Sequence, residues 1–143
     1  FDVALSDFAH IERTGHRGTI VVFADVLPWR QEVAWRVQPG PEATWAQDWC
    51  GDVFKVMAVL DEYRPDLTQI LVDVQPAGAL IVTGLDPRNM VLPRAQLRLR
   101  ERFASQHRVT DGVLDRIGAV SPVEALETIS EGETKGHLGP VVR

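Results

Sequence analysis

The chain has 143 residues, of which 45% are hydrophobic and 24% charged, and this suits one globular domain that needs no disulfide or structural metal. Its net charge of −5, from 15 basic and 20 acidic side chains, argues against broad binding to a nucleic-acid backbone, which needs a basic face. The single cysteine, Cys50, excludes an internal disulfide, and no Cys/His spacing typical of a zinc site is present.

The first third of the chain predicts a helix, a strand and a long aromatic loop. Apolar residues at helical spacing predict an amphipathic helix over residues 1–13. The continuous apolar run at 19–24 predicts a strand that is covered on both faces, as in parallel sheets. The loop at 28–49 contains all four tryptophans, and a loop of this length in a compact domain is usually functional or mobile.

The middle of the chain predicts a helix followed by two strands. The helix starts with Asp52 as its N-cap and ends before Pro65. Residues 67–74 and 79–84 then form strands, joined by a type I turn at 75–78. A four-residue connection makes this pair antiparallel, because a parallel pair needs a long crossover.

The rest of the chain is predicted to be helical before it ends in a tail. A periodic apolar pattern predicts a helix over residues 93–107. Ser121 and Glu124 have capping-box spacing, so a last helix is expected at 122–130. Residues 131–143 are glycine-rich and polar, which predicts a flexible tail.

Nothing in the sequence indicates a membrane or a secretory route. The longest apolar runs, such as 19–23 and 79–82, are far too short to cross a bilayer. No signal peptide is recognisable, and we therefore expect a cytoplasmic protein. The chain opens on Phe1 without an initiator methionine, which fits a fragment of a longer protein or a processed product.

Several short strings resemble one bacterial branch of the class I S-adenosylmethionine-dependent methyltransferases. They are TIVVFADVLP at 19–28, WCGDVFKV at 49–56, YRPDL at 63–67, VDVQPAG at 72–78 and VTGLDP at 82–87. The predicted ending, with an antiparallel strand after parallel ones, also resembles that family. The resemblance covers about residues 3–92.

The resemblance implies an α/β fold, namely the C-terminal part of a doubly wound, Rossmann-like methyltransferase sheet. Residues 19–24, 67–74 and 79–84 would be its fifth, sixth and seventh strands. The seventh is an antiparallel hairpin strand inserted next to a parallel one, so that it is flanked by the other two.

The domain organisation follows from the same resemblance. Residues 1–92 would form the C-terminal half of the methyltransferase-like domain, residues 93–130 would add C-terminal helices, and residues 131–143 the tail. The first four strands, with the turn that binds the cofactor, would lie upstream of Phe1. No glycine-rich phosphate-binding turn follows a predicted strand in this chain.

The first candidate site residue is Asp25. It follows a predicted parallel strand at its carboxyl end, where open α/β sheets place their ligands. It is our candidate catalytic residue, as a general base or for substrate orientation; the alternative is a carboxylate that caps the following turn. Relatives tend to have two acidic residues here, whereas this chain has Ala24 in the first position.

The candidate substrate-binding residues come from the aromatic loop and the helix behind it. Trp29 and Trp49 would contribute to an aromatic wall for the acceptor, or else pack the loop onto the domain. Asp52 and Lys55 would line the acceptor pocket, or else serve as an N-cap and a solvated lysine.

The resemblance implies methyl transfer from S-adenosylmethionine to a hydroxyl or amine of a small molecule. This chain would supply the acceptor-side half of the domain, and the missing N-terminal half would hold the cofactor. The alternative is a non-enzymatic dimerisation or accessory module. Because the strand at 19–24 would have an unprotected edge, we also expect a homo-oligomer unless the missing half covers that edge.

Overall fold

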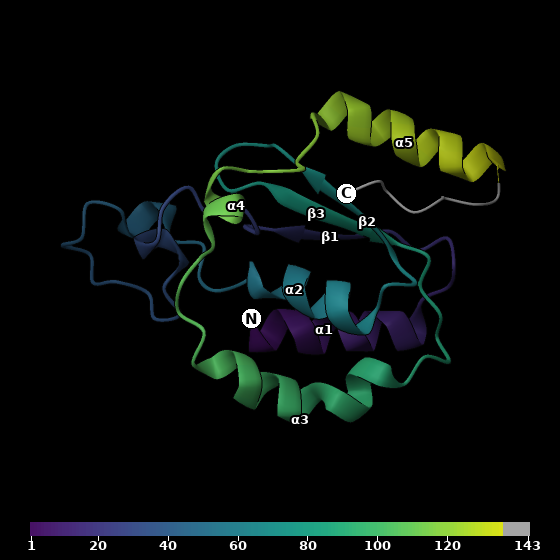
Figure 1. Ribbon diagram of the computed structural model, residues 1–143, viewed down its shortest axis with the longest axis horizontal. Coiled ribbons are helices and arrows are strands. Elements are labelled where there is room, and N and C mark those ends of the chain that lie inside the picture. Colours follow the sequence, from purple (N-terminus) through teal and green to yellow (C-terminus); the bar gives the residue numbers. More distant parts are fainter. Residues whose placement is uncertain (136–143) are drawn as a thin grey trace.

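The computed structural model describes the backbone of residues 1–135 and the side chains of residues 1–131. Its elements in chain order are α1 (Asp2–Thr14), β1 (Val21–Ala24), the 3-10 turns η1 (Glu32–Ala34) and η2 (Ala46–Asp48), α2 (Lys55–Tyr63), β2 (Thr68–Val72), β3 (Ala79–Thr83), α3 (Val91–Ala104), α4 (Asp111–Leu114) and α5 (Pro122–Lys135) (Figure 1). The described part is a mixed α/β structure with one small antiparallel sheet.

The sheet has the strand order β1-β3-β2, and β3 is antiparallel to both neighbours. Ile81 of β3 is opposite Val22 of β1 on one side and Ile70 of β2 on the other. The two outer strands are therefore parallel to each other, and the chain passes from β1 to β2 through α2. The predicted arrangement, in which the strand at 79–84 is flanked by the other two, is confirmed.

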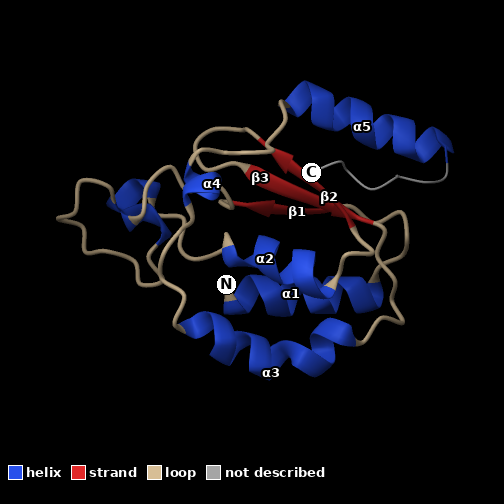
Figure 2. Cartoon of the chain, viewed as in Figure 1, coloured by secondary structure: helices blue, strands red, loops and turns tan. Residues whose placement is uncertain are grey.

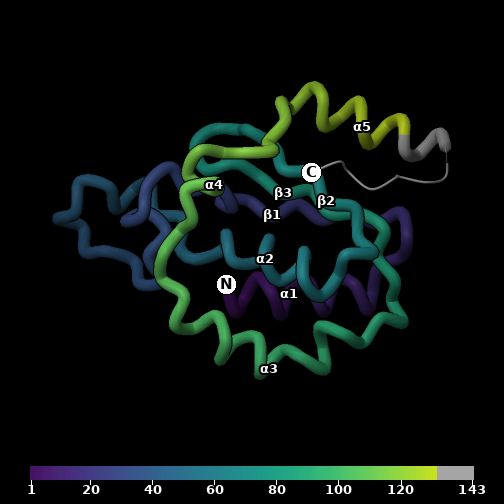
Figure 3. Tube along the Cα trace, in the orientation of Figure 1, coloured from purple at the N-terminus to yellow at the C-terminus, as the bar shows by residue number. Residues whose placement is uncertain are grey.

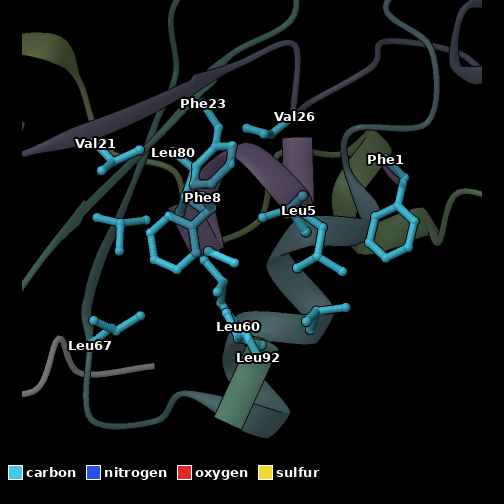
Figure 4. Packing of buried hydrophobic residues seen from close by; sticks show 14 of the residues in the cluster. Phe1, Leu5, Phe8, Val21, Phe23, Val26, Leu60, Leu67, Leu80 and Leu92 are labelled. Atoms are coloured by element: carbon cyan, nitrogen blue, oxygen red, sulfur yellow. The ribbon is translucent and has the colours of Figure 1, made fainter. Parts of the chain in front are cut away.

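Helices α1 and α2 cover one face of the sheet, α3 packs on the side of these two helices away from the sheet, and α5 lies on the other face (Figure 2). The main core forms between the three helices and the sheet, where Phe8 of α1 packs on Phe23 of β1 with ring centroids 5.5 Å apart (Figure 4). Leu5, Leu60 and Leu92 are fully buried in the same core. Each such side chain contributes about 1.5–3 kcal/mol of hydrophobic stabilisation.

The opposite face of the sheet is only partly covered. Ala125 of α5 packs on Ile70 and Val72 of β2, whereas Val22 of β1 is 60% exposed. Ile20, just before β1, is also exposed. The expectation that strand 19–24 is covered on both faces is therefore wrong, because α5 covers β2 and leaves β1 uncovered.

A buried ion cluster fixes the C-terminal end of α2. The guanidinium of Arg64 is fully buried, and it pairs with Glu12 of α1. It also donates to both carboxylate oxygens of Asp66, at 2.8 and 2.7 Å. The carboxylates keep the pKa of Arg64 above its ordinary value even though burial opposes the charge. The helix ends at Tyr63, in agreement with the predicted stop before Pro65.

Two expected boundaries differ from the structure. The turn before β3 is closed by a hydrogen bond from Gly78 N–H to the Val74 carbonyl (2.7 Å), so it is wider than a type I turn at 75–78. Helix α5 continues to Lys135 and so includes the start of the predicted tail, whereas residues 136–143 lie outside the described residues.

The predicted start of α5 is confirmed. Ser121 Oγ accepts a hydrogen bond from the Glu124 N–H (3.2 Å), as a capping residue does. Figure 3 shows α5 beside the sheet, on the side opposite α1 and α3. In the described part, no helix is long and apolar enough to cross a membrane.

Candidate functional site

The carboxyl end of β1 is held against the turn that precedes β3. Asp25 follows β1 with φ of 63°, in the left-handed region that Asp and Asn tolerate better than most residues. Its N–H donates to the Gly78 carbonyl (3.1 Å), and the N–H of Leu27 donates to the Ala77 carbonyl (2.6 Å). These two bonds fix the position from which the Asp25 side chain starts.

The Asp25 carboxylate is half-buried and accepts no hydrogen bond from any residue that the structure describes. It therefore does not cap the turn that follows β1. Partial burial raises the pKa of this carboxyl above its ordinary value. A carboxylate with a raised pKa is a stronger proton acceptor, as general-base catalysis requires.

Asp52 and Lys55 form a buried ion pair at the start of α2. The Lys55 ammonium donates to Asp52 Oδ2 at 2.8 Å and to the Phe103 carbonyl at 3.0 Å, and only 1% of the Lys55 surface is exposed. Asp52 Oδ1 accepts from the nitrogen of Phe1 (2.6 Å). The expected N-cap with a solvated lysine is wrong, because α2 starts later, with Phe54 at the N-cap position.

The charge state of Asp52 follows from these contacts. Burial alone would raise the pKa of this carboxyl, but the hydrogen bonds from Lys55 and the Phe1 nitrogen outweigh it and lower the pKa. Asp52 is therefore ionised at neutral pH, and Arg36 Nη1 lies 3.8 Å from its Oδ2. Arg36 is also paired with Asp2 of α1.

A cavity of about 390 Å³ lies beside this ion pair. It is lined by Ala34, Trp35, Arg36, Val37, Asp52, Lys55, Gln106 and His107. It lies at the same end of the domain as the carboxyl end of β1, because α2 starts there before it returns to β2. Open α/β sheets bind their ligands at this end.

Trp29 and Trp49, the two tryptophans that were predicted to bind the substrate, lie outside this cavity. The guanidinium of Arg30 lies over the Trp29 ring, with its carbon Cζ 4.8 Å from the ring centroid. Trp49 donates from Nε1 to the Trp35 carbonyl (2.6 Å) and lines a separate, more polar hollow of about 820 Å³. The structure thus brings Asp52 and Lys55 together, and it places neither Trp29, Trp49 nor Asp25 on the cavity wall.

Sequence reasoning missed six residues of the cavity wall, of which Ala34 and Val37 are apolar and the other four are Trp35, Arg36, Gln106 and His107. The tryptophan-rich loop at 28–49 contains Trp35 and Arg36, so the sequence did point to the region of these two residues. Nothing in the sequence relates the last two to Asp52, since they follow α3 about fifty positions along the chain and reach the cavity only through tertiary packing.

Metal and thiol chemistry are not supported by the described residues. They contain no group of three His, Cys, Asp or Glu side chains placed to hold a metal ion. Burial, with the nearby carboxylates of Asp25 and Asp48, raises the pKa of the Cys50 thiol to about 11. The thiol therefore stays protonated and is a poor nucleophile.

Comparison of this chain with family models, with curated proteins and with solved structures finds no match.

Proposed function

We propose that this chain is the acceptor-side half of an S-adenosylmethionine-dependent methyltransferase domain that acts on a small molecule in the cytoplasm. The observation that carries the proposal is the strand order β1-β3-β2, with β3 antiparallel between two parallel strands. This is the order that the resemblance to class I methyltransferases implies for their last three strands.

The placement of α1 supports a larger sheet. In a right-handed strand–helix–strand connection, the face of the sheet on which the helix lies determines on which side of the first strand the second strand is added. Helices α1 and α2 lie on the same face, and the chain advances through α2 from β1 toward β2 (Figure 1). A strand that leads into α1 would therefore pair with the open edge of β1, parallel to it.

S-adenosylmethionine does not fit the described residues. Cofactors of this kind are held at a short, glycine-rich turn between a strand and a helix. The connection from β1 to α2 is instead the long tryptophan loop, and β2 leads directly into a hairpin with β3. The proposal therefore assigns the cofactor to another part of the domain and only the acceptor to this chain.

Asp25 is the proposed catalytic residue of the acceptor side. Its carboxylate has a raised pKa and no hydrogen-bond donor among the described residues, so it is able to take the proton that an acceptor hydroxyl or amine loses. Asp52 and Lys55 are the proposed substrate-binding residues, because both line the cavity at this end of the domain.

A second candidate function is a dimerisation or accessory module without catalysis. The open edge of β1, together with the exposed side chains of Val22 and Ile20, favours it. Such an apolar edge pairs readily with another chain. In this alternative, Asp25 would have no role beyond the turn that it starts.

The two candidates are separated by replacing Asp25 with Asn in the full product of the reading frame. Asn keeps the left-handed backbone and removes the proton acceptor. Methyl transfer to the acceptor is expected to fall by about 100-fold, with no loss of thermal stability. An unchanged rate of transfer would exclude Asp25 as the proton acceptor, and no transfer by the parent protein would favour the non-catalytic module.

A further inference from the structure

We infer that the 390 Å³ cavity beside α2 binds an uncharged aromatic compound through a hydroxyl group. This inference deepens the proposed function, since it names the chemical class of the acceptor. The hydroxyl in the cavity anchors the ring and is distinct from the reacting group, because Asp25 does not line the cavity.

The polar wall of the cavity offers both partners that a hydroxyl needs. Lys55 uses two N–H donors, on Asp52 and on the Phe103 carbonyl, and an ammonium group has three. Asp52 is an ionised acceptor with lone pairs beyond those used by Lys55 and the Phe1 nitrogen. A ligand hydroxyl that accepts from Lys55 and donates to Asp52 would use the hydrogen-bonding capacity that these contacts leave.

The charges around the cavity favour a neutral ligand. Lys55 is neutralised by Asp52, and Arg36 by Asp2. A carboxylate or phosphate would have to compete with these carboxylates for the same cations. Burying an additional charge without its own counter-charge is costly, whereas a hydroxyl requires only the two hydrogen bonds.

The apolar part of the cavity wall favours a flat ring. Trp35 is 51% exposed, and its neighbours on this wall are Ala34 and Val37. Trp45 packs edge-on against the Trp35 indole with ring centroids 5.2 Å apart, so this indole is held on one side before any ligand arrives. Trp49 donates to the Trp35 backbone carbonyl and so fixes the backbone there. An aromatic ring that packs on this held indole loses little conformational entropy.

The test uses 2-naphthol as the probe, titrated into the chain and followed by two-dimensional proton–nitrogen NMR. We expect saturable binding and nuclear Overhauser contacts from the naphthol protons to the Trp35 indole and the Val37 methyl groups. Trp35→Ala should weaken the affinity about tenfold. Trp29→Ala is the matched control, because Trp29 is a half-exposed tryptophan of the same loop that lies outside the cavity. It should change the affinity for 2-naphthol less than about twofold.

Charge and ring are tested separately with 2-naphthoate and cyclohexanol, and both should bind more weakly than 2-naphthol. Absence of naphthol binding, tighter binding of the naphthoate, or equal losses in the two tryptophan variants would overturn the inference. Contacts of the probe to Trp29 or Trp49 instead would also overturn it. None of these measurements involves methyl transfer, so their failure leaves the proposed function to be judged by its own assay.

Discussion

The ammonium group of Lys55 lies 2.8 Å from Oδ2 of Asp52, and both side chains are buried where α2 begins. Lys55 also donates to the Phe103 carbonyl at the end of α3. One ion pair therefore links the start of α2 to α3 and, through the Phe1 nitrogen, to α1. The same pair forms the polar wall of the cavity, so fold and site depend on it together.

Replacing Asp52 with Asn should destabilise the fold by about 3 kcal/mol, because it leaves the Lys55 ammonium buried without a counter-charge. Urea denaturation measures the loss. The double variant with Lys55→Met is the control, and it should recover part of the lost stability because the unpaired charge is gone. A double variant whose loss is the sum of the two single losses would show that the two groups do not interact.

Replacing Asp25 with Asn should change how stability depends on pH. The folded-state pKa of Asp25 is raised, so the folded state holds this proton more tightly than the unfolded state. The stabilisation of the folded state by this proton is fully present below the ordinary carboxyl pKa. It is lost as pH rises through the raised pKa of the folded state. Asp25→Asn should therefore be more stable than the parent at pH 7, and the gain should vanish near about pH 3. An equal difference at both pH values would exclude the carboxyl as its source.

Replacing Gly78 with Ala should disrupt the contact that positions Asp25. Gly78 has φ of 65°, and a Cβ atom there would lie 2.5 Å from Cδ1 of the fully buried Leu27. We expect a loss of roughly 3 kcal/mol in the free energy of unfolding, from overpacking and backbone strain together.

The matched control for this change is Gly118→Ala. Gly118 also has a positive φ, of 83°, but nothing lies within 4 Å of a Cβ atom there. It should lose only about 1 kcal/mol, from backbone strain alone. Equal losses at the two glycines in thermal or urea unfolding would mean that the Leu27 contact is unimportant.

The open edge of β1 should make the isolated chain self-associate. Val22 is 60% exposed on that strand, and a lysine there would oppose strand pairing at little cost to the monomer. Sedimentation equilibrium should show a dimer or larger species for the parent chain and a monomer for Val22→Lys. Leu97→Lys, at a 72% exposed position of α3, should leave the association unchanged. A parent chain that stays monomeric over a wide concentration range would contradict this prediction.

The sequence was sufficient to predict the strand order and most of the helices. The four residues at 75–78 force a hairpin, and the place of β3 between β1 and β2 is the one that the resemblance to methyltransferases implied. These are local constraints on chain length and periodicity, which a single sequence contains.

The burial of the site was not predictable in the same way. Lys55 is buried because the Phe103 carbonyl, 48 positions away, faces it, and no local pattern encodes that contact. The exposure of Val22 depends on where α5 packs, which is equally non-local. Trp35 rather than Trp29 lines the cavity for the same reason, since spacing within the loop does not distinguish them.

The most direct test of the central claim is calorimetric titration of S-adenosylmethionine into two proteins, the 143-residue chain and the full product of the reading frame that encodes it. If the chain is the acceptor-side half of a methyltransferase domain, the full product binds the cofactor with micromolar affinity and the chain alone gives no heat of binding. Micromolar binding by the chain alone, or no binding by the full product, would contradict the account.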